Sequence, residues 1–391
     1  MSKIVRHVHI FTRDLRTTDN NAFKSFDRIV PVFHFNTEQL HRRNKSERAI
    51  SFMRQTVSDL GLITFEGTLA EFCDWLEPRA KNAKLTICED YTKYALKRQQ
   101  ILKKRFQQLE IIEDLFLHDS SLLIKKDGTC YTSFGAFYKN ASKIQVNKVS
   151  SRGLKIDLDK FRNRDILSSD NSQRISTKLN FGVYSIRQVY NATTDSEFRK
   201  QIHWRQFYQC ILKWHPRAKE YIHLDPRFDS VKWQTVDNIK TEWSDFMKCE
   251  TNVLLVDAAM SELLQTGFMN NRMRILWGTY VTKYLRIPIY DKNGIVALFS
   301  KYLEDCSTSQ NKLNCEWVLG SLDLSGKQFS PKGKPLVGRP MNVMAIKKYK
   351  AFNYIRKWIP RCRQMTDKEI LSVVPKHDPV KQWQAWVKSA S

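Results

Sequence analysis

Residues 255–274 read LVDAAMSELLQTGFMNNRMR, and this stretch predicts two helices separated by a glycine. A helical pattern runs from Leu255 to Thr266, and Gly267 follows, at the position where helices commonly end in a left-handed residue. A second helical pattern begins at Asn271 and continues to Arg286. The stretch therefore predicts a helix, a turn and a helix.

The pattern stays helical over most of the chain on either side of this stretch. Further helices are expected at residues 197–214 and 295–303. In the second of these, Ile295, Leu298 and Phe299 begin an apolar stripe at i, i+3 and i+4, which is typical of a helix with one face in a core. Residues 171–391 are therefore predicted to form an all-α domain.

The first 120 residues instead alternate short β-rich runs with helical patterns. The expected strands are residues 8–11, 29–33, 62–65, 85–88 and 111–117, and the expected helices are residues 46–60 and 94–109. Such alternation predicts a parallel sheet covered on both faces, which is a Rossmann-like α/β domain over residues 1–120. Ligands of such sheets bind at the carboxyl ends of the strands. No GxGxxG motif follows the first run, so an ordinary dinucleotide site is not predicted there.

Residues 121–170 are polar and poorly periodic, with runs of Lys, Asn and Ser. They are predicted to be a long interdomain connector on the surface. The predicted fold class is thus α/β plus all-α.

Composition favours a partner that carries negative charge. The chain has 391 residues, 42% of them hydrophobic, which is enough for two domains. Its 65 Lys and Arg against 40 Asp and Glu give a formal charge of +25. A surplus of this size favours contact with nucleic acid, because cations placed on phosphates release condensed counterions. A Lys-rich solvated surface is the alternative interpretation.

The eight cysteines form no CxxC pair, so neither a zinc site nor a disulfide framework is predicted. No apolar run reaches the roughly 18 residues that a membrane span requires, and the N-terminal MSKIVRHVHIF is a poor signal peptide. We expect an intracellular, soluble monomer, in cytoplasm or nucleus, with no metal and no membrane partner.

Five segments, in order along the chain, resemble motifs of the DNA photolyase/cryptochrome family. They are FTRDLR (11–16) with DN (19–20); RIS (174–176) with LNFG (179–182) and SIR (185–187); HWRQFY (203–208); VDAAM (256–260) with QTGFMNNRMR (265–274); and YIRKWIP (354–360). The resemblance is to cyclobutane pyrimidine dimer photolyases of the class I type, in a divergent form. It implies that the helical domain binds FAD and that the partner is DNA containing pyrimidine dimers.

The resemblance also implies which residues hold FAD. It places the phosphates on a serine-rich loop of Ser172, Gln173, Arg174, Ile175 and Ser176, although the residues alone favour a plain helix cap. The other implied cofactor residues are Arg205, Asn271, Arg274, Asp305, Ser307 and Asn311. Arg274 and Asp305 are expected to pair beside the flavin ring, and Asn311 to face its N5 atom. The alternatives are a structural salt bridge and an ordinary loop asparagine.

A DNA-binding face is predicted on the helix at residues 197–214. Gln201, Trp204 and Arg205 are spaced i, i+3 and i+4 and so share one side of that helix. A ring for stacking, a cation for phosphate and an amide for base edges suit a flipped-out base. The resemblance adds Trp317 as a second wall of this pocket, Asn311 as a further catalytic residue, and Asn271 and Arg272 as DNA contacts.

Ordinary core packing is the alternative for each tryptophan.

Three departures from the family pattern bear on activity. Gln201 stands where cyclobutane dimer photolyases carry a glutamate, and Ser307 replaces a second aspartate near the adenine side of FAD. Cys315 replaces the tryptophan nearest the flavin in the family's electron relay. The usual relay is therefore interrupted, and Trp277, Tyr280 or Tyr290 are candidates for another route. Asn270 replaces a histidine that six-four photolyases use, which argues against six-four repair.

Three functions remain open at this point: a cyclobutane dimer photolyase, a cryptochrome-like blue-light sensor or repair-deficient flavoprotein, and a DNA-binding relative that has lost FAD. The sequence ranks repair first. An antenna chromophore of the folate or deazaflavin type is not identified by any motif.

Overall fold

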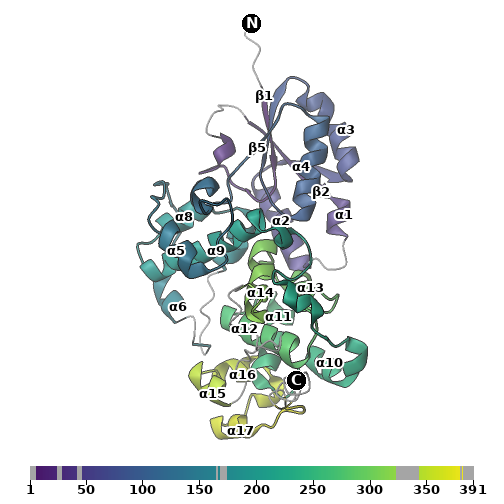
Figure 1. Ribbon diagram of the computed structural model, residues 1–391, viewed down its shortest axis with the longest axis vertical. Coiled ribbons are helices and arrows are strands. Elements are labelled where there is room, and N and C mark those ends of the chain that lie inside the picture. Colours follow the sequence, from purple (N-terminus) through teal and green to yellow (C-terminus); the bar gives the residue numbers. More distant parts are fainter. Residues whose placement is uncertain are drawn as a thin grey trace. The chain divides into compact units, whose positions relative to one another are not determined.

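The computed structural model describes residues 6–23, 29–41, 46–163, 166–167, 174–322, 343–378 and 381 (Figure 1). The chain divides into two compact units, and each unit is discontinuous in sequence. Unit 1 comprises Met1–Ile156, Arg174–Glu220 and Asp305–Ser309. Unit 2 comprises Asp157–Gln173, Tyr221–Glu304 and Gln310–Ser391. The domain boundaries drawn from the sequence stay a prediction.

Unit 1 contains a five-stranded, fully parallel sheet with the strand order β3-β2-β1-β4-β5. The strands are β1 Arg6–Phe11, β2 Ile29–Asn36, β3 Ile63–Gly67, β4 Ala83–Cys88 and β5 Leu109–Ile112. The α/β domain followed by a helical domain, which the sequence predicts, is confirmed.

Alternation along β1 explains why both faces of the sheet are covered. Val8 and Ile10 belong to one buried core with α3 (Leu69–Ala80) and α4 (Lys93–Arg105). Phe11 belongs to a second core with Val57 of α2 (Glu47–Asp59), which follows the short α1 (Thr37–Leu40). Successive side chains of a strand point to opposite faces, so one strand supplies both cores.

The predicted strand at residues 111–117 is wrong from Glu113 onward, because β5 comprises Leu109–Ile112. After this residue the chain leaves the sheet, and the carboxylates of Glu113 and Asp114 reach cations outside it. Glu113 accepts a hydrogen bond of 2.8 Å from Lys213, and Asp114 accepts from Arg187. The apolar residues at 111–117 gave no sign that the chain leaves the sheet after Ile112.

The helices of unit 1 that follow the sheet are α5 Phe134–Ala141, α7 Ile175–Phe181, α8 Ile186–Asn191 and α9 Ser196–Trp214. Helix α5 lies within residues 121–170, the segment that the sequence analysis expects to connect the two domains. It packs against α9, and Phe137 and Ala141 are fully buried. The stripe Phe134, Phe137, Tyr138 and Ala141 has the spacing of an amphipathic helix, within an otherwise polar segment.

Unit 2 is helical in its described part. Its α-helices are α6 Leu158–Arg162, α10 Lys240–Met247, α11 Leu254–Thr266, α12 Asn271–Thr279, α13 Ile295–Tyr302, α14 Leu313–Leu319, α15 Val343–Lys348, α16 Phe352–Trp358 and α17 Asp367–Ser372. Helix α11 packs against α10, α12 and α16. The predicted helix, glycine and helix are confirmed, because Gly267 ends α11 with a φ of 66°.

Helix α12 is shorter than the sequence predicts. It ends at Thr279 and continues as a π-helical turn, η6 (Tyr280–Tyr284). The remaining short turns are η1 Asn21–Phe23, η2 Ser120–Leu123, η3 Pro216–Lys219, η4 Pro226–Ser230, η5 Val236–Ile239, η7 Thr308–Lys312 and η8 Pro360–Cys362. Single π-helical turns often occur at functional sites.

A buried ion network joins the strand ends of unit 1 to α8. Arg187 donates from Nε to Asp19 at 2.9 Å and from Nη2 to Asp114 at 2.8 Å. Arg16 donates to the same Asp114 carboxylate. The Arg187 and Asp114 side chains are only 7% and 1% exposed, so each charge depends on its partners for compensation.

Replacing Arg187 by Met should therefore lower the free energy of unfolding by about 3–5 kcal/mol, because it leaves buried carboxylates poorly compensated. The matched control is Arg105→Met, since Arg105 pairs with Asp74 and Glu77 in an exposed network and its loss should leave stability close to that of the wild type. Urea denaturation of the three proteins measures the difference. Equal losses in both variants would contradict the importance of the buried network.

Candidate functional site

Helix α9 carries three of the predicted site residues, and Asp195 caps its first turn by accepting from the Phe198 amide at 2.8 Å. Gln201 is exposed on this helix, while Trp204 and Arg205 are partly buried. The i, i+3, i+4 spacing places the three side chains on one side of α9, and the exposure decreases from Gln201 to Trp204 and Arg205. Their contact with DNA stays a prediction.

The indole of Trp204 is held by a ring that the sequence did not predict as part of the site. Phe134 of α5 stacks on it with ring centroids 3.7 Å apart and planes 10° from parallel. Tyr138 stacks in turn on Phe134 at 5.5 Å. The three rings form a column that fixes the orientation of the indole. The only sequence signal for Phe134 is its place in the aromatic stripe of α5.

A second group of residues surrounds Arg13, at the carboxyl end of β1. Its guanidinium donates to the Asn180 carbonyl at 3.1 Å and to the Ser307 hydroxyl at 3.2 Å. Asn180 donates to the Cys306 carbonyl at 3.0 Å and so joins α7 to the segment Asp305–Ser309. We call Arg13, Asn180, Arg205, Asp305 and Ser307 the Arg13 cluster.

The Arg13 cluster suits an anionic ligand. Burial lowers the pKa of Arg205, the nearby charge of Arg13 lowers it further, and the Asp305 carboxylate opposes both effects. A guanidinium remains charged in proteins, so Arg13 and Arg205 give the cluster two positive charges, and Arg13 also pairs with the Asp90 carboxylate at 3.5 Å. The Ser307 hydroxyl adds a neutral polar group beside Arg13, and cations with a hydroxyl are groups that bind phosphate oxygens.

The predicted phosphate loop is described only in part. Ser172 and Gln173 lie outside the described residues. Arg174 is exposed, precedes α7 with a φ of 48°, and makes no side-chain cap on that helix. Ile175 and Ser176, both partly buried, form the first turn of α7. Their contact with a phosphate stays a prediction.

In unit 2, the predicted residues gather at the start of α12. Asn270 caps this helix by accepting from the Arg272 amide at 2.8 Å. Arg274 donates from Nε to the Met269 carbonyl at 2.8 Å, and its guanidinium lies 5.6 Å from the Phe268 ring. The chain before α12 thus orients Arg274 from two sides.

Helix α14 and the turn before it hold the other residues predicted in unit 2. Asn311 lies buried in the π-helical turn η7, and Trp317 is partly buried in α14. Asn314 of α14 donates to Asn271 of α12 at 3.4 Å, which links the two helices. Arg274 and Asp305 belong to different units, so their ion pair stays a prediction.

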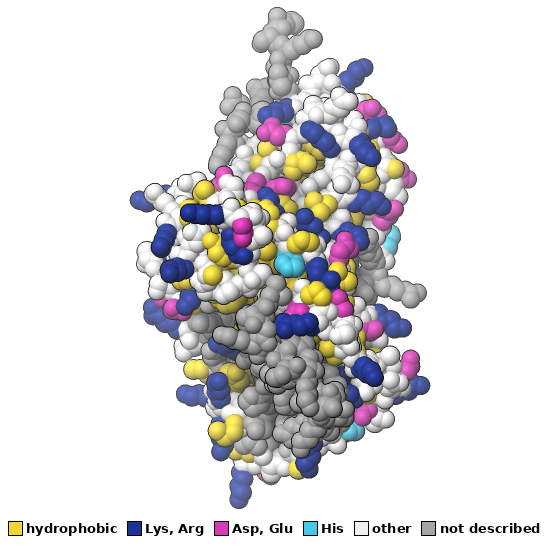
Figure 2. Space-filling model, viewed as in Figure 1, with side chains coloured by type: hydrophobic (Ala, Val, Ile, Leu, Met, Phe, Trp, Pro, Cys, Tyr) yellow, Lys and Arg dark blue, Asp and Glu magenta, His cyan; other side chains and the backbone are white. Residues whose placement is uncertain are grey.

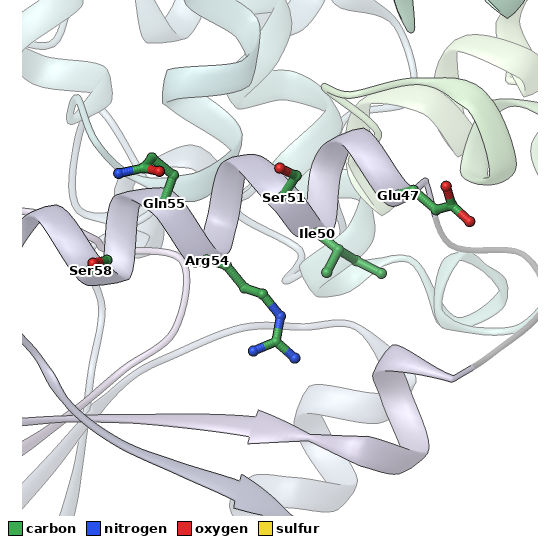
Figure 3. A pocket seen from close by; sticks show the side chains of 6 residues that line it. All are labelled: Glu47, Ile50, Ser51, Arg54, Gln55 and Ser58. Atoms are coloured by element: carbon green, nitrogen blue, oxygen red, sulfur yellow. The ribbon is translucent and has the colours of Figure 1, made fainter.

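Other surface features do not coincide with these residues. A shallow groove follows one side of α2 (Figure 3), and it is lined by Glu47, Ile50, Ser51, Arg54, Gln55 and Ser58. On the face drawn in Figure 2, Lys and Arg side chains are spread widely, in keeping with the charge of +25. Among the described residues, no helix is long and apolar enough to cross a membrane, and no three His, Cys, Asp or Glu side chains gather as metal ligands.

Two family models match the chain, one for each part of the predicted fold. Residues 7–152 match the model described as DNA photolyase, and residues 198–389 match the model described as FAD binding domain of DNA photolyase. The second match covers α9 and the helices α10 to α17. It also includes every predicted site residue except those of the loop at residues 172–176.

Individual proteins agree with these matches. The deoxyribodipyrimidine photo-lyase of Streptomyces griseus is 23% identical over 96% of this chain and 92% of its own length. An archaeal photolyase structure from Sulfolobus tokodaii, with two FAD molecules, matches with a TM-score of 0.80 at 22% identity, covering 99% of both chains. The structure of a bacterial class III photolyase from Agrobacterium tumefaciens matches with a TM-score of 0.75 at 19% identity, and the match covers 100% of this chain and 92% of that structure. The class I type is thus not established.

Helix α9 also contains a buried histidine, His203, whose pKa is lowered. His203 is 2% exposed and its ring stacks on His118 at 5.9 Å. Burial, followed by the charge of His118, lowers the pKa of His203 from 6.5 to about 4. The unfolded chain therefore binds a proton more readily than the folded one between these two values, and stability falls as the pH falls through this window.

Replacing His203 by Phe should reduce the loss of stability on acidification, by up to about 3 kcal/mol across the window from pH 6.5 to pH 4. Urea denaturation of the wild type and the variant at a series of pH values measures the two slopes. Parallel slopes would contradict the assignment of this acid sensitivity to His203.

Proposed function

The chain belongs to the DNA photolyase/cryptochrome family, and from this premise we propose that it is a light-driven DNA repair flavoprotein that splits cyclobutane pyrimidine dimers. The observation that carries the proposal is the match of residues 198–389 to the FAD binding domain of DNA photolyase. Relatives named deoxyribodipyrimidine photo-lyase support the proposal that this chain carries out the same reaction. The relative from Streptomyces griseus is 23% identical to this chain.

The cofactor of this proposal is FAD, and the side chains present suit it. The Arg13 cluster offers guanidinium groups and a serine hydroxyl, which are groups that bind phosphate and ribose oxygens. Asn271, Arg274 and Asn311 of unit 2 offer amide and guanidinium groups for the polar edge of the flavin ring. When bound and reduced, FAD supplies the electron that light drives into the dimer. The protein contributes position, a dry site and fixed charges.

The DNA partner is proposed to reach α9. A flipped-out base stacks on the face of Trp204 opposite Phe134, so that the column of three rings continues into the nucleic acid. In this proposal Gln201, which is exposed one turn before Trp204, bonds base edges, and Arg272 contacts the DNA backbone. The charge of +25 supports binding to the phosphate backbone.

A second candidate function is a blue-light sensor or repair-deficient flavoprotein. Gln201 favours it, because an amide cannot stabilise a developing cation as a carboxylate does. Cys315, buried in α14, favours it too, because it stands in place of a relay tryptophan. Both functions need FAD, and they differ in whether the dimer is split.

Light-dependent loss of thymine dimers from an irradiated oligonucleotide decides between the two functions. The protein is first reduced chemically, so that the assay does not depend on any internal electron relay. We expect dimers to disappear under blue light and to persist in the dark. A reduced, flavin-containing protein that leaves all dimers intact in the light would support the sensor and overturn the repair proposal.

Replacing Trp204 by Ala should weaken binding to dimer-containing DNA by about 1–3 kcal/mol, the usual worth of one stacked base, while binding to undamaged duplex stays unchanged because no charge is removed. Binding isotherms on both DNAs at one salt concentration measure this. The control Trp75→Ala removes a tryptophan from the α3 surface of the sheet core and should leave both affinities unchanged. Equal weakening on damaged and undamaged DNA would contradict the pocket at Trp204.

A further inference from the structure

One face of the Trp204 indole is covered by a ring from another helix. Phe134 of α5 lies nearly parallel to the indole, with the planes 10° apart and the ring centroids 3.7 Å apart. Successive bases of a DNA strand follow one another at a similar spacing of about 3.4 Å. Phe134 therefore occupies the position that a base would take on this face of the indole.

Phe134 is held in this position by the packing of α5 on α9. Tyr138, one turn further along α5, stacks on Phe134 at 5.5 Å, and Phe207 of α9 meets it nearly edge to face at 5.8 Å. On the same helix, Phe137 and Ala141 are fully buried. A ring held by both helices cannot leave the indole unless α5 itself is rearranged.

The covered face lies near the surface and next to positive charge. Phe134 and Tyr138 are only partly buried. Lys139 is exposed on α5, and Lys143 is exposed just after it. The ammonium of Lys200 lies 5.7 Å from the Tyr138 ring. Cations beside accessible aromatic rings are the combination by which proteins hold single strands without regard to sequence. An uncovered indole here would therefore favour any unpaired strand.

The number of accessible indole faces decides what Trp204 can bind. An indole with two open faces can insert between successive bases of a flexible strand and gain stacking on both sides. An indole with one covered face stacks on a single base, at the end of a column of rings. The second arrangement suits a base that has been taken out of its strand.

We propose that Phe134 is a specificity-determining residue, which covers one face of Trp204 and so prevents the indole from inserting into undamaged strands. The other face is then reserved for a flipped-out base, and this part of the inference rests on the proposed function. Phe134 acts through Trp204, so it is a positioning residue. Its role involves neither the cofactor nor any step of the reaction.

Replacement of Phe134 by Ala tests this role in the dark, at one salt concentration. The measurement is the affinity for an undamaged single-stranded oligothymidine and for the same strand with one dimer. We expect Phe134→Ala to bind the undamaged strand about 5-fold more tightly, which is the lower end of what one stacked base contributes. The dimer-containing strand should gain less, so the preference for the dimer falls. Unchanged or weaker binding of the undamaged strand, which a merely structural role predicts, would overturn the proposal.

Phe65→Ala is the matched control. Phe65 is partly buried and contacts Trp75 with ring centroids 5.4 Å apart, so its loss uncovers an indole outside the site. Both affinities should stay at the wild-type values in this variant. A gain equal to that of Phe134→Ala would mean that any newly exposed aromatic surface binds the strand, and it would overturn the assignment to Phe134.

Acrylamide quenching of tryptophan fluorescence shows directly whether the indole is uncovered. Quenching should increase in Phe134→Ala, and the increase should be absent when Trp204→Phe is added. No increase would overturn the covering role. If Phe134→Ala fails to fold, Phe134→Leu keeps an apolar side chain without a flat ring. It should also bind the undamaged strand more tightly than the wild type does, and the absence of this gain would overturn the proposal.

The variant Trp204→Ala separates this inference from the proposed function. If Trp204→Ala weakens binding to the dimer while Phe134→Ala leaves the undamaged strand unaffected, the role of Phe134 fails and the pocket at Trp204 stands. If Trp204→Ala has no effect on binding to the dimer, the pocket fails and the role of Phe134 fails with it.

Discussion

The fold of unit 1 depends on four charges that are buried together at the carboxyl edge of the sheet. Arg16 and Arg187 share the Asp114 carboxylate, and Arg187 also binds Asp19. Charges removed from water are tolerated only when all of them are paired in good geometry. This requirement fixes the loop after β1, the loop after β5 and the start of α8 relative to one another, although they are far apart in sequence.

The placement of the site in unit 1 follows from this constraint. Three residues before Arg16, the guanidinium of Arg13 meets Asn180 and Ser307. Gly182 makes the approach possible, because a Cβ at this residue would lie 2.0 Å from the Arg13 carbonyl oxygen and its φ is 74°. The motif residues at the end of β1 therefore hold α7 and the segment Asp305–Ser309 against the carboxyl edge of the sheet.

Much of the architecture could be predicted from local patterns, and the parts that could not depend on distant contacts. Short apolar runs predicted the strands of the sheet, and Gly267 predicted where the first helix of the pair ends. Both signals lie within the segment that they describe. The end of β5 escaped prediction because the carboxylate of Asp114 is drawn to cations elsewhere in the chain. For the same reason the stacking of Phe134 on Trp204 has no signature in spacing.

We propose above all that this chain binds FAD, as the match of residues 198–389 to the FAD binding domain of DNA photolyase suggests. The most direct measurement is the flavin content of the purified protein, by visible absorption and by chromatography of the molecule released on denaturation. The account predicts a yellow or blue protein that releases FAD in a ratio near one to each chain. A colourless protein that also fails to take up added FAD would contradict it.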